Sequence, residues 1–310
     1  MNMALIGLGK MGYPLALNLQ DNGWEPVVYN RTHEKVQAIA GEGVAGVEHL
    51  QAFASLTSPR AFWLMIPAGR PVDDMLQQLK TILQPGDCVI DGGNSHYKDT
   101  LRRYREMAGH QVSYVDVGTS GGVDGARHGA CMMVGGEAEP VRLLAPILRS
   151  LCVPEGYAHV GGPGAGHYVK MVHNGIEYGM MQAIAEGFQV MDASDFSLDP
   201  AQVAHVWRHG SVIRSWLMDL TENVFREHGG LEGIKGVVNA SGEGLWTLQE
   251  ALEKEVPVPA LSAAVFNRYR SKMAAPLADK LLAGLRFQFG GHSMELVNPE
   301  PETDTGEETP

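Results

Sequence analysis

The feature that most constrains this chain is a change in its hydrophobic pattern near the middle. Over the first half, short apolar runs alternate with amphipathic stretches. The runs predict strands at Met3–Ile6, Val27–Tyr29, Phe62–Ile66, Cys88–Asp91, Ser113–Val117 and Cys131–Val134, and the stretches predict helices at Tyr13–Asn22, Glu34–Ala40, Val72–Leu83 and Thr100–Ala108. This alternation requires crossover connections. We therefore expect an N-terminal Rossmann domain, which is a doubly wound, mostly parallel sheet with helices on both faces.

From His167 to Arg286 the sequence has helical periodicity and almost no strand signal. Helices are predicted at Tyr168–Met191, Pro200–His209, Trp216–Glu227, Trp246–Glu255 and Leu261–Leu282, with Trp207, Trp216 and Trp246 in a helical core. The predicted organisation is a Rossmann domain over residues 1–163, an all-helical substrate and dimerisation domain over residues 164–293, and a disordered acidic tail over residues 294–310.

The charge of the chain narrows the choice of partners. Six of its twelve net negative charges lie in residues 294–310, and the whole balance argues against nucleic acid or an anionic membrane as partner. Three scattered cysteines indicate free thiols in a reducing compartment and no Cys-rich metal site. No secretory signal and no run of about twenty apolar residues is found. We therefore expect a cytoplasmic protein without a bound metal or a membrane segment.

A glycine-rich turn follows the first predicted strand and opens the first predicted helix. It consists of Gly7, Leu8, Gly9, Lys10, Met11 and Gly12. In this context the first glycine permits a tight turn, the second lets a pyrophosphate approach the backbone, and the third packs the helix against the strand. The N-terminus of the helix also attracts phosphate groups. The turn therefore predicts a dinucleotide cofactor.

The residues that end the second predicted strand bear on which dinucleotide binds. A site for NAD usually has Asp or Glu there, whereas this chain has Asn30, Arg31 and Thr32. An amide, a guanidinium and a hydroxyl can each donate to a 2′-phosphate, so NADP is favoured over NAD. Arg31 could instead stack on the adenine of either cofactor. The residues predicted to complete the cofactor site follow the third and fourth strands: Ile66, Pro67, Ala68 and Asn94.

The most informative segment is a polar stripe on the first helix of the second half. Its members are spaced i, i+3, i+4, i+7 and i+8 on an otherwise apolar helix: Lys170, His173, Asn174, Glu177 and Tyr178. A solvated face with a Lys–Glu pair is the simpler interpretation, but such a face seldom gathers His, Asn and Tyr beside the charges. If the stripe faces the cofactor, a partly desolvated lysine there would have a lowered pKa and could act as a base.

Two glycine-containing segments after strands are predicted to complete the cleft. Asp91–Ser95 offers the amide of Asn94, and Gly118–Gly122 offers the Ser120 hydroxyl together with backbone donors. Turn formation alone would also explain these glycines. Loops at the carboxyl ends of parallel strands are nevertheless where ligands bind in this architecture.

Together these residues resemble the 6-phosphogluconate dehydrogenases, within the wider β-hydroxyacid dehydrogenase superfamily. The specific matches are Asp91–Ser95, Thr119–Gly122, Gly166–Gly179 and the terminal Arg286–His292. The superfamily shares the glycine turn, the Ser-Gly-Gly segment and the lysine, whereas the run from His173 to Tyr178 narrows the resemblance to phosphogluconate. At this length the chain is similar to the short form of the family, which has a smaller helical domain.

The resemblance implies oxidative decarboxylation of 6-phosphogluconate to ribulose 5-phosphate and CO2, a step of the pentose phosphate pathway, with NADP or NAD reduced. It implies Lys170 as the base and Glu177 as the acid that protonates the enediol. The residues implied to hold the sugar acid are Asn94, Ser120, Gly121, Gly122, His173 and Asn174, and those implied to bind its phosphate are Tyr178, Arg268, Arg286 and His292. Arg286 and His292 would come from a neighbouring subunit of a homo-oligomer, either a dimer or a tetramer.

One departure from the family pattern concerns the phosphate site. Where longer members carry a phosphate-binding lysine before a Trp-Thr pair, this chain reads Ser241, Gly242, Glu243, Gly244 and Leu245 before Trp246 and Thr247. The carboxylate in this run is Glu243. A carboxylate there would repel phosphate unless an arginine pairs with it.

Two other functions stay open. One is a β-hydroxyacid dehydrogenase for a small non-phosphorylated acid, against which the implied cationic pocket argues. The other is a catalytically silent NADP-sensing protein, which would be expected to have lost Lys170 or Glu177.

Overall fold

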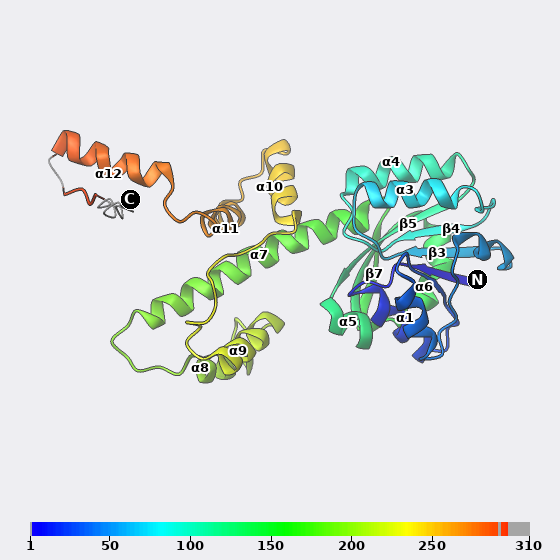
Figure 1. The fold of residues 1–310 in the computed structure, drawn as a ribbon, viewed down its shortest axis with the longest axis horizontal. Helices are drawn as coiled ribbons and strands as arrows, with labels where there is room; N and C mark the ends of the chain where they lie inside the picture. The colour runs from blue at the N-terminus through cyan, green and yellow to red at the C-terminus, as the bar shows by residue number, and fades with distance from the viewer. Residues whose placement is uncertain (1, 291–292, 297–310) are drawn as a thin grey trace, which may run out of the picture.

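The computed structural model describes residues 2–290 and 293–296. Its N-terminal half is built on one seven-stranded sheet, seen on the right of Figure 1. The strands are β1 (Asn2–Ile6), β2 (Val27–Tyr29), β3 (Arg60–Leu64), β4 (Cys88–Asp91), β5 (Ser113–Ser120), β6 (Ala130–Gly135) and β7 (Cys152–Gly161). They lie in the order β2-β1-β3-β4-β5-β6-β7, and every neighbouring pair is parallel except β5 and β6.

Six of these strands were predicted, and β7 was missed. Its first half contains Pro154, Glu155 and Gly156, which interrupt any alternation of apolar and polar residues. It lies at the edge of the sheet and is mostly exposed, so burial leaves little hydrophobic signal in its sequence. A second difference is that β5 continues to Ser120, so Gly118–Ser120 belong to a strand and only Gly121 and Gly122 follow it.

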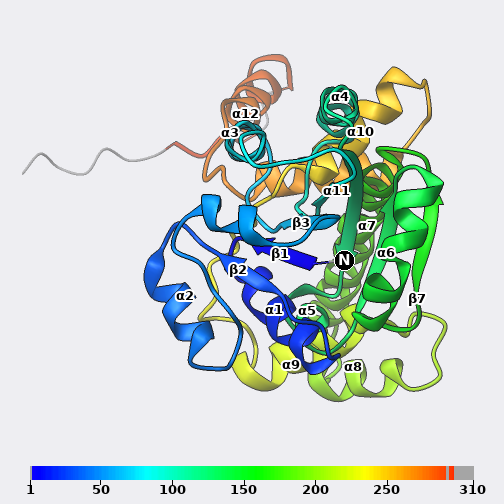
Figure 2. The same cartoon turned by 90° about the vertical axis from the view of Figure 1, so that its right-hand side faces the viewer.

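Helices cover both faces of the sheet, as predicted. Four of them were predicted: α1 (Gly12–Asp21), α2 (His33–Ala40), α3 (Arg70–Leu79) and α4 (Tyr97–Ala108). Three were not predicted: the short 3-10 helix η1 (Leu50–Ser55), α5 (Gly122–His128) and α6 (Ala138–Ser150). Leu15 of α1 and Leu144 of α6 belong to the buried cluster on one face, and Leu76 of α3 and Met107 of α4 to the cluster on the other. Figure 2 shows α3 and α4 on one side of the sheet and α1 and α5 on the opposite side.

The second half is helical, as predicted. Its helices are α7 (Ala165–Asp192), α8 (Pro200–Arg208), α9 (Trp216–His228), α10 (Glu243–Glu253), α11 (Pro259–Arg270) and α12 (Leu277–Gly290). In Figure 1, α7 leads away from the sheet, with α8 and α9 on one side of it and α10 and α11 on the other. The prediction of one helix over Leu261–Leu282 was wrong, because the chain turns between α11 and α12 where Pro276 precedes the new helix.

Two further properties concern the described residues only. Over residues 2–290 and 293–296, none of the helices combines the length and the apolar character needed to cross a membrane. In the same part of the chain, no three His, Cys, Asp or Glu side chains are grouped so that they could hold a metal ion. Most of the acidic tail, residues 297–310, lies outside the described residues.

Candidate active site

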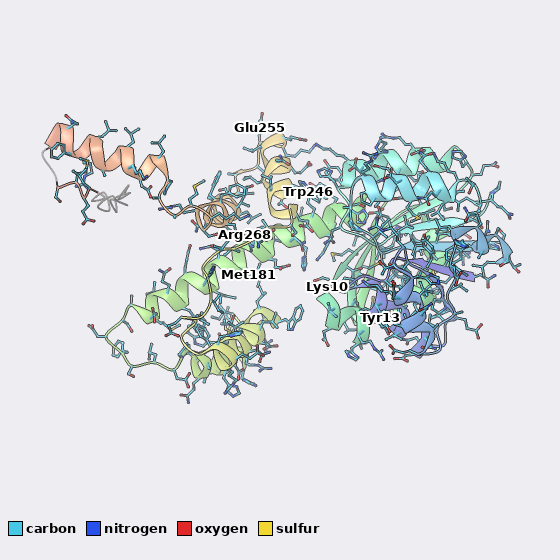
Figure 3. The ribbon with its side chains drawn as sticks, viewed as in Figure 1. Lys10, Tyr13, Met181, Trp246, Glu255 and Arg268 are labelled. Carbon is cyan, nitrogen blue, oxygen red and sulfur yellow. The ribbon has the colours of Figure 1, made fainter. Side chains whose placement is uncertain are left out.

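A cleft of about 1100 Å³ lies where the Rossmann domain meets the helices. The Rossmann domain contributes the glycine turn, the residues that follow β3 and β4, and the end of β5 with the glycines after it. The helical half contributes one face of α7 together with the first residues of α9 and α10. In Figure 3, Lys10 lies at the edge of the Rossmann domain that faces the helices, and Trp246 lies beside α7. Residues far apart in the sequence thus line one cleft.

The glycine turn has the geometry that its spacing predicts. Gly7 adopts a φ of +104°, and a Cβ there would collide with the carbonyl oxygen of Met65. A Cβ on Gly12 would collide with the carbonyl of Gly7, so α1 packs directly on the turn. Gly9 instead borders the cleft, with no atom within 4 Å of where its Cβ would be. The turn is closed on the protein side and open on the ligand side, which fits a pyrophosphate against the backbone.

Asn30 connects the glycine turn to the end of β2. Its Oδ1 accepts a hydrogen bond from the backbone N–H of Leu8 at 2.9 Å, and its Nδ2 donates to the carbonyl of Thr32 at 3.0 Å. The amide is therefore already used within the loop, which the sequence interpretation did not foresee. Arg31 and Thr32 are exposed beside it.

The polar stripe of α7 faces the cleft and is not a solvated face. Lys170, Asn174 and Tyr178 are buried, while His173 and Glu177 are half-buried. All of these except Tyr178 line the cleft. His173 bridges to the Rossmann side, because its Nε2 lies 3.2 Å from the Ser120 Oγ. The other ring nitrogen of His173 lies 3.0 Å from Asn174 Oδ1 and 3.9 Å from Glu177 Oε2.

Two contacts with β5 fix the position of Lys170 in the cleft. The buried carboxylate of Asp116 accepts backbone hydrogen bonds from Gly164 and His167, each at 2.8 Å, so the start of α7 is tied to the strand. A Cβ on Gly118 would collide with the Lys170 side chain, so only glycine lets the helix come this close. Burial lowers the pKa of Lys170, and the carboxylates of Glu177 and Glu243 oppose this effect. An amine in such a site can exchange protons with a substrate.

The segment after β4 is braced from below by a buried carboxylate. Asp91 accepts hydrogen bonds from the Ser95 hydroxyl at 2.7 Å, the Tyr114 hydroxyl at 2.9 Å and the Gly93 N–H at 3.2 Å. The guanidinium of Arg103 also donates to Ser95 at 3.1 Å. This network leaves Asn94 exposed at the cleft, between the glycine turn and α7. The cleft also includes Ile66, Pro67 and Ala68 after β3.

The residues predicted to bind phosphate are only partly brought together. The Tyr178 hydroxyl accepts a hydrogen bond from the backbone N–H of Ser241 at 3.3 Å, and the Arg268 guanidinium lies 3.6 Å from the centroid of the Tyr178 ring. Figure 3 shows Arg268 next to α7. Arg286 lies in α12, which Figure 1 shows standing away from the rest of the same chain. His292 lies outside the described residues.

Sequence reasoning missed the contribution of α9. The cleft is also lined by Ser215, Trp216, Leu217 and Leu220. The prediction that Trp216 belongs to a helical core was wrong, because its side chain is 51% exposed and its ring lies 3.8 Å from the Cβ position of Gly122. Trp246 also borders the cleft, and its side chain is half-buried. No local pattern distinguishes a tryptophan that faces a cleft from one that faces a core.

Comparison with known proteins identifies the family. Residues 2–160 match the NAD binding domain of 6-phosphogluconate dehydrogenase, and residues 166–283 match the C-terminal domain of 6-phosphogluconate dehydrogenase. The chain belongs to the 6-phosphogluconate dehydrogenase family. It is therefore an NAD(P)-dependent oxidoreductase, as the resemblance implied.

Three relatives illustrate the range of the family. A Bacillus subtilis chain named as a candidate 6-phosphogluconate dehydrogenase is 45% identical, and the match covers 95% of this chain and 99% of the relative. The NAD(+)-dependent, decarboxylating 6-phosphogluconate dehydrogenase of Haloferax volcanii is 40% identical, over 95% of this chain and 98% of the relative. The solved 6-phosphogluconate dehydrogenase of Plasmodium falciparum, described with its cofactor NADP+ and with its substrate 6-phosphogluconate, is 31% identical with a TM-score of 0.82. That match covers 96% of this chain and 67% of the solved one.

Proposed function

We propose that this protein catalyses the oxidative decarboxylation of 6-phosphogluconate to ribulose 5-phosphate and CO2, with NADP or NAD as hydride acceptor. One observation carries the proposal: a single cleft is lined by the glycine turn of the Rossmann domain and by Lys170, His173, Asn174 and Glu177 of α7. This arrangement can place a sugar acid between a dinucleotide and an amine of lowered pKa.

The chain's own residues fit the nicotinamide cofactor. The open space beside Gly9 has room for a pyrophosphate. Arg31 is exposed just after β2, where the adenosine ribose of the cofactor would bind. When bound there, the cofactor supplies a hydride acceptor. Ile66, Pro67, Ala68 and Asn94 would then line the path toward the nicotinamide.

Lys170 would serve first as base and then as acid. As C3 of the substrate is oxidised, the neutral amine takes the proton of the 3-hydroxyl. The C1–C2 bond of the resulting β-keto acid then breaks, and CO2 leaves while its bonding electrons pass to the ketone oxygen. The ammonium of Lys170 returns its proton to the oxygen that receives these electrons, so a neutral enediol forms.

Glu177 would complete the reaction by protonating the enediol carbon that had carried the carboxylate, while the neutral amine of Lys170 takes the proton from the enediol oxygen and the ketone of ribulose 5-phosphate forms. It lies two turns further along α7 and is half-buried at the same cleft. Asn94, Ser120, Gly121, Gly122, His173 and Asn174 would hold the sugar acid, and Tyr178 and Arg268 would approach its phosphate.

We also propose that the active unit is a homo-oligomer. Five large apolar side chains of α12 are exposed: Leu277, Leu281, Leu282, Leu285 and Phe287. A free apolar helix of this kind is unfavourable in water and favours association with another copy. Arg286, on the same helix, would then reach the phosphate in a neighbouring subunit.

The test is an assay of NADP and NAD reduction with 6-phosphogluconate, with CO2 and ribulose 5-phosphate measured as products. Lys170→Met is the control. It should lose about 10²–10⁴-fold in turnover, because it lacks the general base, and still bind cofactor. Absence of turnover by the wild type with either cofactor, or a Lys170→Met variant that retains more than about a tenth of the activity, would refute the proposal.

A further inference from the structure

Glu243 is a buried carboxylate at the cleft that the reaction described above does not use. Its side chain is only 3% exposed, and its Oε2 has no hydrogen-bond partner among the described residues. Within the same part of the chain, no ion pair involves this carboxylate. Arg268 stacks on Tyr178 and donates to the carbonyl of Asn239, and it makes no ion pair with Glu243 among the described residues. Leaving a carboxylate oxygen buried without a partner is unfavourable, so the side chain is expected to meet a donor when the cleft is filled.

The packing of α10 on α7 fixes where Glu243 lies. The Thr247 hydroxyl donates to the carbonyls of Met171 at 2.7 Å and of Glu243 at 2.9 Å. On the facing helix, a Cβ at Gly175 would lie 2.7 Å from the Thr247 side chain, so the two helices are in close contact. Glu243 is the first residue of α10, so this contact holds its backbone beside the cleft that its side chain lines.

The same packing places Glu243 along α7 between the reacting end and the phosphate end of the proposed substrate. Its neighbour Gly244 lies directly against the ring of Tyr178, and a Cβ at Gly244 would collide with that ring. At the other side, the Glu243 carboxylate is close enough to Lys170 to act on its charge. In the proposed complex Lys170 lies beside C3 and Tyr178 lies beside the phosphate. The part of the substrate between them, next to Glu243, carries the hydroxyls of C4 and C5.

We propose that Glu243 is a substrate-binding residue whose carboxylate accepts a hydrogen bond from the C4 or C5 hydroxyl of the sugar acid. This rests on the proposed function. A carboxylate is an acceptor only and repels a phosphate, whereas a hydroxyl is the donor that such a substrate offers. A site that buries an acceptor for a hydroxyl discriminates strongly against an analogue that lacks this hydroxyl, because the acceptor is then left unpaired. Glu243 thus sets specificity for the polyol part of the chain.

The test pairs protein variants with substrate analogues. Wild type, Glu243→Gln and Glu243→Ala are assayed with 6-phosphogluconate and with its 4-deoxy and 5-deoxy analogues. Loss of the paired hydroxyl should lower kcat/KM of the wild type by about 10- to 100-fold, the range for a hydrogen bond to a charged group, and that of Glu243→Ala less than about threefold. Glu250→Gln is the matched control, because Glu250 is a buried carboxylate on the same helix that already pairs with the Tyr97 hydroxyl at 2.7 Å. It should keep the wild-type penalty.

The outcomes separate the inference from the proposed function. If the wild type turns over 6-phosphogluconate but each deoxy analogue suffers the same penalty in wild type and in both Glu243 variants, the role of Glu243 is refuted and the reaction stands. A lower KM for 6-phosphogluconate in Glu243→Gln would also refute it, since that result would mean the carboxylate only repels the phosphate. If the wild type shows no turnover, the proposed function fails and the inference with it. Thermal unfolding and NADP binding establish whether each variant is folded. If Glu243→Ala does not fold, Glu243→Gln still provides the test.

Discussion

At the scale of single residues, the environment of Lys170 decides what this side chain can do. It is buried against β5 because Gly118 leaves room for it and because Asp116 holds the start of α7. Burial lowers its pKa, and the carboxylates of Glu177 and Glu243 keep it from falling further. The balance of these effects determines the fraction of neutral amine at a given pH, and therefore the pH range of the first step.

Replacing Glu177 with Gln should move the acid limb of the pH profile of kcat/KM to lower pH. The change removes a carboxylate that raises the pKa of Lys170, so the pKa falls. A base must be unprotonated, and kcat/KM therefore rises with pH through this pKa and does so at lower pH in the variant. The measurement is the pH profile of NADPH formation in a single turnover, because Glu177 is proposed to act only after this step. A limb that is unmoved or shifted to higher pH would contradict the expectation, and Glu250→Gln should leave it unchanged.

Asn30→Asp should shift cofactor preference from NADP toward NAD. Aspartate can still accept the N–H of Leu8, as Asn30 does at 2.9 Å, but its other oxygen faces the Thr32 carbonyl and carries charge toward the ribose. A carboxylate there repels a 2′-phosphate and accepts hydrogen bonds from the ribose hydroxyls. Arg31→Ala should lower efficiency with NADP by about 10- to 100-fold, the range for a charge-assisted hydrogen bond, and spare NAD. The measurement is catalytic efficiency with both cofactors. A wild type that already prefers NAD would show that Arg31 only stacks on the adenine.

At the scale of elements, the packing of α10 against α7 shapes the part of the cleft that the helical half contributes. Gly175 allows Thr247 to approach, and Gly244 allows α10 to lie on the Tyr178 ring. The Thr247 hydroxyl then joins the two helices through the carbonyl of Met171. A small residue on each helix is what lets two side chains of the site, Lys170 and Glu243, come from different elements and still share one cleft.

Gly175→Ala should destabilise the protein and weaken substrate binding. The added methyl would lie 2.7–2.9 Å from the Thr247 side chain, so α10 must shift, at a cost of about 1–3 kcal/mol in the free energy of unfolding. Gly187→Ala is the matched control on the same helix, because no atom lies within 4 Å of its Cβ position. It should stabilise the protein by about 0.5–1 kcal/mol through helix propensity alone. Chemical unfolding and the KM for 6-phosphogluconate are the measurements, and equal stabilities of the two variants would show that the crossing is not tightly packed.

At the scale of the whole molecule, α12 is separate from the elements that line the cleft (Figure 1). The Rossmann domain, α7, α9 and α10 line the cleft. Figure 1 shows α12 standing apart from them, and five of its large apolar side chains are exposed to solvent. Of the four residues expected at the phosphate, Arg286 lies in α12, and His292 lies outside the described residues. Under the proposed function, we therefore expect another copy of the chain to supply part of the phosphate site.

Removal of residues 277–310 should abolish self-association and raise the KM for 6-phosphogluconate. The deletion takes away the exposed apolar helix α12 and Arg286, while every residue of the cofactor turn remains. Affinity for NADP should therefore be unchanged. The control deletion of residues 297–310 keeps α12 and should leave both properties as in the full chain. Sedimentation and steady-state kinetics are the measurements, and a longer deletion with the association and KM of the full chain would rule out a role for α12 in another subunit.

The sequence by itself determined the local features of this protein. Six strands, the glycine turn and the polar stripe of α7 were predicted because each depends on neighbours within a few residues, through hydrophobic period or glycine geometry. The edge strand β7, the break at Pro276 and the antiparallel pairing of β5 with β6 were not, because sheet edges and chain reversals leave weak periodic signals. Only the tertiary structure showed that Trp216 faces the cleft, that Asn30 is used inside its own loop, and that Glu243 is buried without a partner. These three depend on contacts between elements far apart in the chain, and such contacts are set by how helices pack.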